Sequence, residues 1–153
     1  MNRQSIAIYL KNCLLLTLGI FYFSEATASE DENEVLFVRR IQPLFHEKCL
    51  ACHGNDQTDI QGGLDMRSMA SLLRGGDQEM PVVVPGKPEK SPIYLAVLRS
   101  HNDWQPMPPK DADKLPPEQI RWINDWISGG AHWPNRDRAE AIRFSRTLPE
   151  NGL

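Results

Sequence analysis

Apolar residues recur at steps of three and four in several stretches of the chain, which is the spacing expected of a helix with one buried face. The first stretch leads directly into Cys49. Its apolar positions are Val35, Val38, Ile41 and Phe45. Pro43 interrupts the pattern and should kink or restart the helix, because proline has no amide proton and its ring clashes with the preceding turn.

The strongest helical pattern runs from Pro117 to Ser128. An apolar stripe follows one face of this segment, and two tryptophans widen the stripe. The stripe consists of Ile120, Ile123 and Ile127, with Trp122 and Trp126 beside it. Glycines at 129–130 should end the helix. Such a helix needs an apolar partner, and the stretch that leads into Cys49 is the natural one.

Two shorter helices are predicted between these segments. One should span 66–74, with Asp65 as its cap and with Leu72 and Leu73 facing inward. A glycine pair follows it and should end it. The other should run over 91–99, because a serine followed by proline is a typical helix start.

Composition limits the fold to one small domain with long loops. The chain has 153 residues, 41% of them hydrophobic, and nine of its twelve prolines fall between Pro81 and Pro117. Three valines at 82–84 favour an extended segment, but a lone extended run cannot form a sheet. The predicted fold class is therefore all-α. A formal charge of −3 gives no indication of nucleic acid or an anionic membrane surface as a partner.

The N-terminus has the pattern of a secretory signal. Arg3 and Lys11 make its start positive, residues 13–23 are almost wholly apolar, and small residues at 26–28 fit a cleavage site. The apolar run is shorter than the ~20 residues that span a bilayer. We therefore expect 1–28 to be removed, and Cys13 with it. The protein should then be exported to the periplasmic or cell-envelope side of the inner membrane, with no membrane span.

The first helix delivers the chain into Cys49-Leu50-Ala51-Cys52-His53, which is the attachment signature of c-type haem. Each thiol can add to one haem vinyl group, and the imidazole that follows can ligate the iron. A redox disulfide or half of a zinc site are the alternatives. Zinc would require a second ligand cluster, and the only other cysteine is Cys13. A thioredoxin-like disulfide would require a buried strand before Cys49, and none is predicted.

Met107, between Pro106 and Pro108, is the candidate for the second axial ligand. A thioether is a weak ligand, so a methionine that binds iron must be held by a stiff backbone, and prolines supply one. Met80 is a weaker competitor, and His101 would give bis-histidine ligation instead. His46 lies one turn before the motif and is expected at the surface or behind the ligands.

Together these segments resemble the planctomycete-type cytochrome c domain. The resemblance spans 35–134, and two of its motifs are far more specific than the haem motif alone: Val-Pro-Gly-Lys-Pro and Gly-Ala-His-Trp-Pro. The motifs, in chain order, are Cys49-Leu50-Ala51-Cys52-His53-Gly54, Gly62-Gly63-Leu64, Leu72-Leu73-Arg74-Gly75-Gly76, Val83-Val84-Pro85-Gly86-Lys87-Pro88-Glu89-Lys90-Ser91, Met107-Pro108-Pro109 and the segment 123–134, which ends Gly-Gly-Ala-His-Trp-Pro.

The resemblance implies a small cytochrome c fold of about four helices wrapped around one covalently bound haem, with proline-rich loops. It assigns Cys49 and Cys52 to haem attachment, His53 to proximal ligation and Met107 to distal ligation. The expected organisation is a signal peptide at 1–28, an acidic spacer at 29–34, the cytochrome c domain at 35–134 and a charged tail or linker at 135–153. A short helix at 138–144 is expected within that last segment.

The expected function is transfer of single electrons between redox partner proteins by one haem c, without catalysis. A peroxidase would need an open iron position and usually a second haem, but the chain has one Cys-x-x-Cys-His. Domains of this family normally sit beside other domains. The alternative functions are therefore a haem-based sensor or binding module, or the redox domain of a larger exported enzyme.

Overall fold

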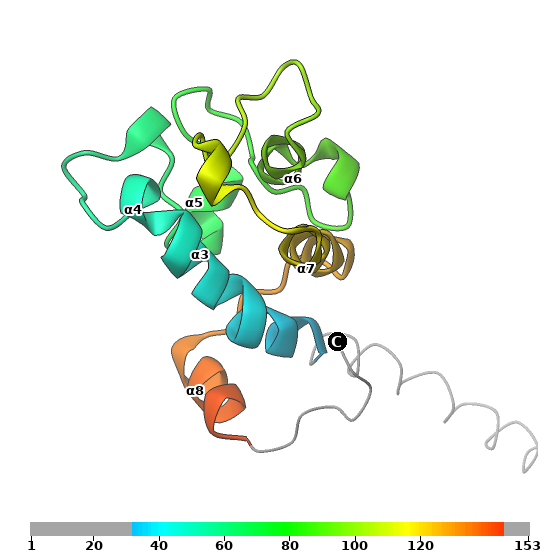
Figure 1. The fold of residues 1–153 in the computed structure, drawn as a ribbon. Helices are drawn as coiled ribbons and strands as arrows, with labels where there is room; N and C mark the ends of the chain where they lie inside the picture. Colours follow the sequence, from blue (N-terminus) through cyan, green and yellow to red (C-terminus); the bar gives the residue numbers. More distant parts are fainter. Residues whose placement is uncertain (1–31, 146–153) are drawn as a thin grey trace, which may run out of the picture.

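The computed structural model describes residues 32–145, and Figure 1 shows them as helices joined by long loops. The expected signal segment at 1–28 lies outside the described residues. Within residues 32–145 there is no strand, so the all-α prediction is confirmed. In that same part of the chain, no helix is both long enough and apolar enough to cross a membrane.

After a helical start at 32–36, the elements are η1 (Phe37–Ile41), α3 (Gln42–Lys48), α4 (Leu50–His53), η2 (Gln61–Gly63), α5 (Met69–Arg74), η3 (Pro88–Lys90), α6 (Pro92–Leu98), η4 (Asp111–Asp113), α7 (Pro117–Ser128) and α8 (Arg136–Phe144).

The first helix widens where the sequence predicted an irregularity. Around η1 it adopts π-helical geometry, and the Gln42 amide donates to the Phe37 carbonyl, five residues back. Pro43 follows at once in the first turn of α3. A wider turn accommodates a residue that lacks an amide proton and would clash with a regular preceding turn. The helix therefore continues through Pro43 and reaches Cys49.

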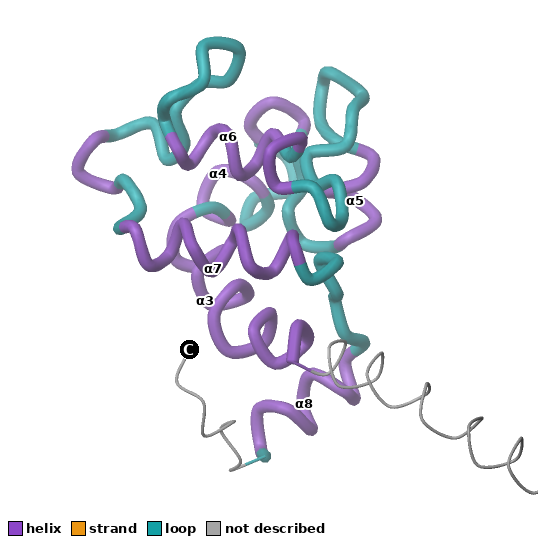
Figure 2. Tube along the Cα trace, turned by 90° about the vertical axis from the view of Figure 1, so that its right-hand side faces the viewer, coloured by secondary structure: helices purple, strands orange, loops and turns teal. Residues whose placement is uncertain are grey.

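The core lies where α7 packs against this first helix (Figures 1 and 2). Trp126 is fully buried, with its ring centroid 5.7 Å from that of Phe37 and 5.8 Å from that of Phe45. Ile123 and Ile127 are also buried. The predicted bounds of α7 and its predicted partner are both confirmed.

Asn33 joins the start of the first helix to the end of α7. Its Nδ2 donates to the Trp126 carbonyl at 3.0 Å, and its Oδ1 accepts from the His132 amide at 2.8 Å. The side chain is buried, and a Cβ at Gly129 would collide with its amide group. Gly129 therefore does more than end α7, since it leaves room for this polar bridge.

Two local predictions for the first short helix are wrong. It begins at Met69, and its cap is Ser68, whose Oγ accepts from the Ser71 amide at 3.1 Å. Asp65 instead accepts from Arg67. Leu72 is buried, but Leu73 is 42% exposed. Ser71 and Leu72 form the buried face of this helix, and Leu73, about 100° further round the axis, lies outside that face.

The second short helix, α6, begins after Ser91 as predicted, but the serine side chain does not cap it. Its Oγ accepts from the Val84 amide at 2.9 Å and donates to the Lys87 carbonyl at 2.9 Å. Ser91 is fully buried. The hydroxyl therefore stabilises the preceding proline-glycine turn, and Pro92 alone starts the helix.

The short helix expected at 138–144 is confirmed as α8, which begins two residues earlier. The Asn135 side chain caps it by accepting from the Arg138 amide at 2.9 Å. Ala139 and Ile142 are buried, and α8 packs against η1. Arg39 of η1 donates to the Ile142 carbonyl at 3.2 Å. Residues 136–144 are therefore packed onto the first helix.

Replacement of Asn33 by alanine should lower the free energy of unfolding by about 1–3 kcal/mol, because the part-buried His132 amide loses its partner and the Trp126 carbonyl keeps only the bond from the Ala131 amide. Urea unfolding followed by tryptophan fluorescence measures this loss. Asn102→Ala, at an exposed position, is the control and should change stability little. Equal stability of the two variants would show that the Asn33 bridge does not hold the helices together.

Candidate functional site

The two cysteines and the histidine of the motif lie on one short helical turn. Cys49 stands between α3 and α4, and its carbonyl accepts from the amides of Cys52 at 3.2 Å and His53 at 3.0 Å. Residues at i, i+3 and i+4 share a face of a helix, so the structure brings the three side chains together. Both thiols are free, with Cys49 half-buried and Cys52 exposed. Covalent capture through both thiols beside an imidazole is therefore compatible with this local geometry.

The backbone of His53 is held on both sides. Its amide bonds to Cys49, and its carbonyl accepts from the Met66 amide at 2.8 Å. The next residue, Gly54, is buried, and a Cβ there would lie 2.9 Å from Cγ of Arg67. The chain can therefore fold back across the motif because residue 54 is glycine.

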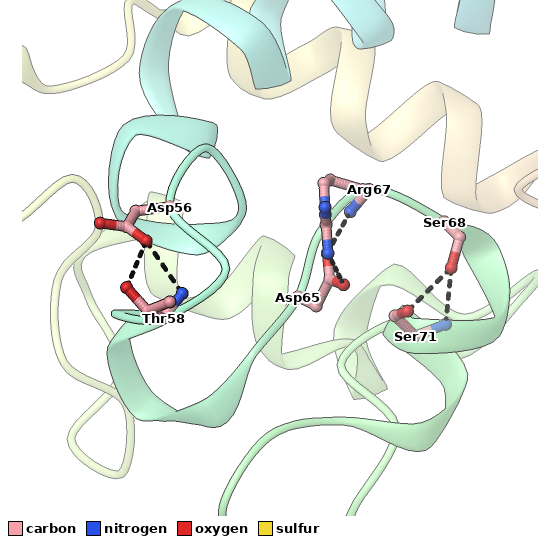
Figure 3. Close-up of polar contacts among 6 residues, drawn as sticks. All are labelled: Asp56, Thr58, Asp65, Arg67, Ser68 and Ser71. Carbon is pink, nitrogen blue, oxygen red and sulfur yellow. Dashed lines mark hydrogen bonds and ion pairs between the residues drawn. The ribbon is translucent and has the colours of Figure 1, made fainter.

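The segment between His53 and α5 contains side-chain hydrogen bonds between residues that are close in the sequence (Figure 3). Asp56 accepts from the Thr58 amide and hydroxyl, and Asp65 accepts from the Arg67 amide and guanidinium. Bonding to Thr58 lowers the pKa of Asp56, and bonding to Arg67 lowers the pKa of Asp65. Both carboxylates are therefore charged at neutral pH and hold the turns that lead from the motif to α5.

The imidazole of His53 provides the first test of whether the residues fit a haem. Its Nδ1 is buried and has no hydrogen-bond partner among residues 32–145. A buried polar atom without a partner costs about 1–3 kcal/mol. A buried imidazole nitrogen without a partner in the described part of the chain is compatible with binding of the ring to a group from outside the chain.

Cys49 provides the second test. Burial, and then the nearby charge of Cys52, raises the pKa of Cys49 to about 12. The thiol is therefore uncharged at neutral pH, whereas disulfide exchange and zinc ligation use the thiolate. A thioether is uncharged, so this buried position suits a cysteine bonded to a haem vinyl carbon.

Met107 is half-buried in the loop between α6 and η4. Its amide donates to the Ala96 carbonyl at 3.0 Å, and it is joined to Pro108 by a cis peptide bond. The Pro108 carbonyl accepts from Arg99. The backbone on both sides of Met107 is therefore fixed, as a soft ligand requires. Its role as an iron ligand stays a prediction.

The competing ligands are more open to solvent. Met80 is 39% exposed, in the turn after α5. The side chain of His101 is 40% exposed, and its Nδ1 accepts from the Asp103 amide. His46 is exposed, in agreement with the expectation that it lies at the surface. Met107 therefore remains the best candidate for the second ligand.

Two surface hollows lie away from these residues. One, of about 620 Å³, is lined by the glycine turn at 75–76 together with Gly63, Arg74, Asp77 and Glu79. The other, of about 470 Å³, lies between Trp133 and α8. Neither is lined by the haem motif or by Met107, so the candidate site rests on its donor residues and their hydrogen bonds.

Sequence reasoning did not single out Arg99, which contacts the loop that carries Met107. In the sequence this arginine marks only the end of a predicted helix. Its φ of +58° lies in the left-handed region, where glycine or asparagine would have signalled such a turn. No pattern in the chain indicates that its side chain folds onto the proline-rich loop.

Residues 49–111 match the family model described as Planctomycete cytochrome C. The matched segment begins at the first motif cysteine and contains His53, Met107 and the loop that follows Met107. The match confirms the predicted planctomycete-type cytochrome c domain over these residues. No curated protein and no solved structure gives a significant match to the chain.

In the chain without haem, Cys52 should be alkylated by iodoacetamide much faster than Cys49. With a pKa of about 12, only roughly one Cys49 thiol in ten thousand is ionised at pH 8. Mass spectrometry of Cys49→Ser and Cys52→Ser, each in the chain without residues 1–28 and thus without Cys13, measures the two rates separately. Equal rates would contradict the burial of Cys49.

Proposed function

Because the chain contains a planctomycete-type cytochrome c domain, we propose that it is an exported c-type cytochrome that carries single electrons with one covalently bound haem. The observation that carries this proposal is the placement of Cys49, Cys52 and His53 on one helical turn within the matched segment. This arrangement can attach a haem and ligate its iron with adjacent residues.

Two segments of the chain would bind the haem: the motif at 49–53 and the loop that contains Met107. Cys49 and Cys52 would form the thioethers, His53 would be the proximal ligand, and Met107 would be the distal ligand. When bound, haem c supplies the redox change, in which its iron alternates between the ferrous and ferric states. The hydrogen bonds to the backbones of His53 and Met107 would keep both ligands in place in the two states.

Exposure at the motif supports transfer to a protein partner. Cys52 is exposed, so the haem edge bonded to it would reach the surface of the protein, while Cys49 is half-buried. An accessible edge allows a redox partner to dock without entering the core. We propose that the partners are redox proteins of the same exported compartment, reached after cleavage near Ala28.

The protein produced with haem-attachment machinery should show the absorption bands of a c-type cytochrome in a reduced-minus-oxidised spectrum. Single variants Cys49→Ala and Cys52→Ala should shift the bands, because one thioether is lost, and the double variant should lose covalent haem. His46→Ala, at an exposed histidine, is the control and should keep the spectrum. Covalent haem in the double variant would contradict the assignment of the attachment sites.

Replacement of Met107 by alanine should lower the reduction potential by on the order of 0.1 V, because methionine ligation favours the ferrous state. It should also remove the weak methionine-to-ferric-iron band at the red end of the spectrum. Met80→Ala is the matched control, and a redox titration should give it the potential of the unmodified protein. Loss of the band in Met80→Ala, with Met107→Ala unchanged, would assign the ligand to Met80.

Rapid binding of carbon monoxide to the reduced protein would favour the sensor or binding module over the carrier. A carrier keeps its distal ligand, so carbon monoxide should bind slowly. Stopped-flow mixing measures the rate directly.

A further inference from the structure

The loop between α6 and η4 has little structure of its own to hold Met107. Residues 99–110 contain no helix or strand and several exposed positions, including 100–103. A methionine thioether binds iron weakly, so small movements of this loop would release it. Contacts that fix the backbone beside Met107 therefore decide whether it stays bound.

Arg99 contacts the chain directly after Met107. Its Nη1 donates to the Pro108 carbonyl at 2.5 Å, and its Nη2 donates to Oδ1 of Asp111 at 2.6 Å. One planar guanidinium thus bridges two points of the loop that lie three residues apart. A lysine has a single ammonium group and cannot present the same fork.

Arg99 is itself fixed at the end of α6. It adopts a left-handed conformation with φ of +58°, and its amide donates to the Ala96 carbonyl at 3.3 Å. The same carbonyl accepts from the Met107 amide at 3.0 Å. The Met107 backbone is thus tied to α6 on one side through Ala96 and on the other through Arg99.

The two bonds of the guanidinium differ in their surroundings. The side chain of Arg99 is 20% exposed, whereas that of Asp111 is 93% exposed. An ion pair with so exposed a partner contributes little, but a charged donor to a partly buried carbonyl contributes more. The bond to Pro108 should therefore matter more than the bond to Asp111.

We propose that Arg99 is a positioning residue that holds Met107 at the haem iron by fixing the Pro108 carbonyl to the end of α6. This inference rests on the proposed function, in which Met107 is the distal ligand. Arg99 does not touch the reacting atoms, and it acts on the ligand through the backbone of the loop.

Carbon monoxide can bind the ferrous iron only after Met107 leaves, so its association rate measures how firmly the loop is held. In the haem-loaded full chain, Arg99→Ala should raise this rate by roughly tenfold. It should also weaken the methionine-to-ferric-iron band. Arg99→Lys, which keeps the charge and one donor, should give an intermediate rate, and it serves as the second variant if Arg99→Ala does not fold.

The controls separate positioning from general stability and from the surface ion pair. Arg121→Ala removes an exposed arginine of α7, and Asp111→Asn removes the negative charge of the exposed partner; both should keep the rate and the band of the unmodified protein. The inference is overturned if Arg99→Ala behaves as Arg121→Ala does, or if its urea midpoint falls while its rate and band stay unchanged. It is also overturned if Asp111→Asn matches Arg99→Ala. An unchanged band in Met107→Ala would instead mean that the proposed ligand is wrong.

Discussion

The packing of the first helix against α7 is the constraint on which the rest of the structure depends. Trp126 is enclosed by Phe37 and Phe45, and Asn33 bonds to the last turn of α7 and to the segment that follows it. These contacts fix the direction of α3, whose last residue, Lys48, precedes Cys49. The haem motif therefore follows directly from a helix that is packed into the core, although its own helix has only one turn.

The two proposed axial ligands are supported by different means. His53 follows the rigid helix, and hydrogen bonds hold its amide and its carbonyl. Met107 lies in an irregular loop and depends on bonds to Ala96 and, one residue later, to Arg99. An imidazole is a strong iron ligand and a thioether a weak one, so the weaker ligand depends more on its backbone. If one of the two proposed ligands leaves the iron, we expect it to be Met107 and not His53.

The sequence predicted the long helices well and the short ones less well. The stripe of α7 and the irregularity at Pro43 follow from hydrophobic period and proline geometry, which are local properties. The cap of α5 did not follow, because Asp65 and Ser68 are both acceptable caps and only the tertiary path of the chain selects Ser68. For the site, spacing indicated the motif, but the burial of Cys49 and the bond from Arg99 to Pro108 depend on how the folded chain brings its segments together, which local patterns do not show.

Mass spectrometry of the protein matured in cells that attach haem to exported chains tests the central claim most directly. We predict one haem per chain, retained after acid–acetone extraction and located on the peptide that contains residues 49–53. An unmodified peptide, or a haem that the extraction removes, would contradict covalent attachment through Cys49 and Cys52, and with it the assignment of electron transfer to this site.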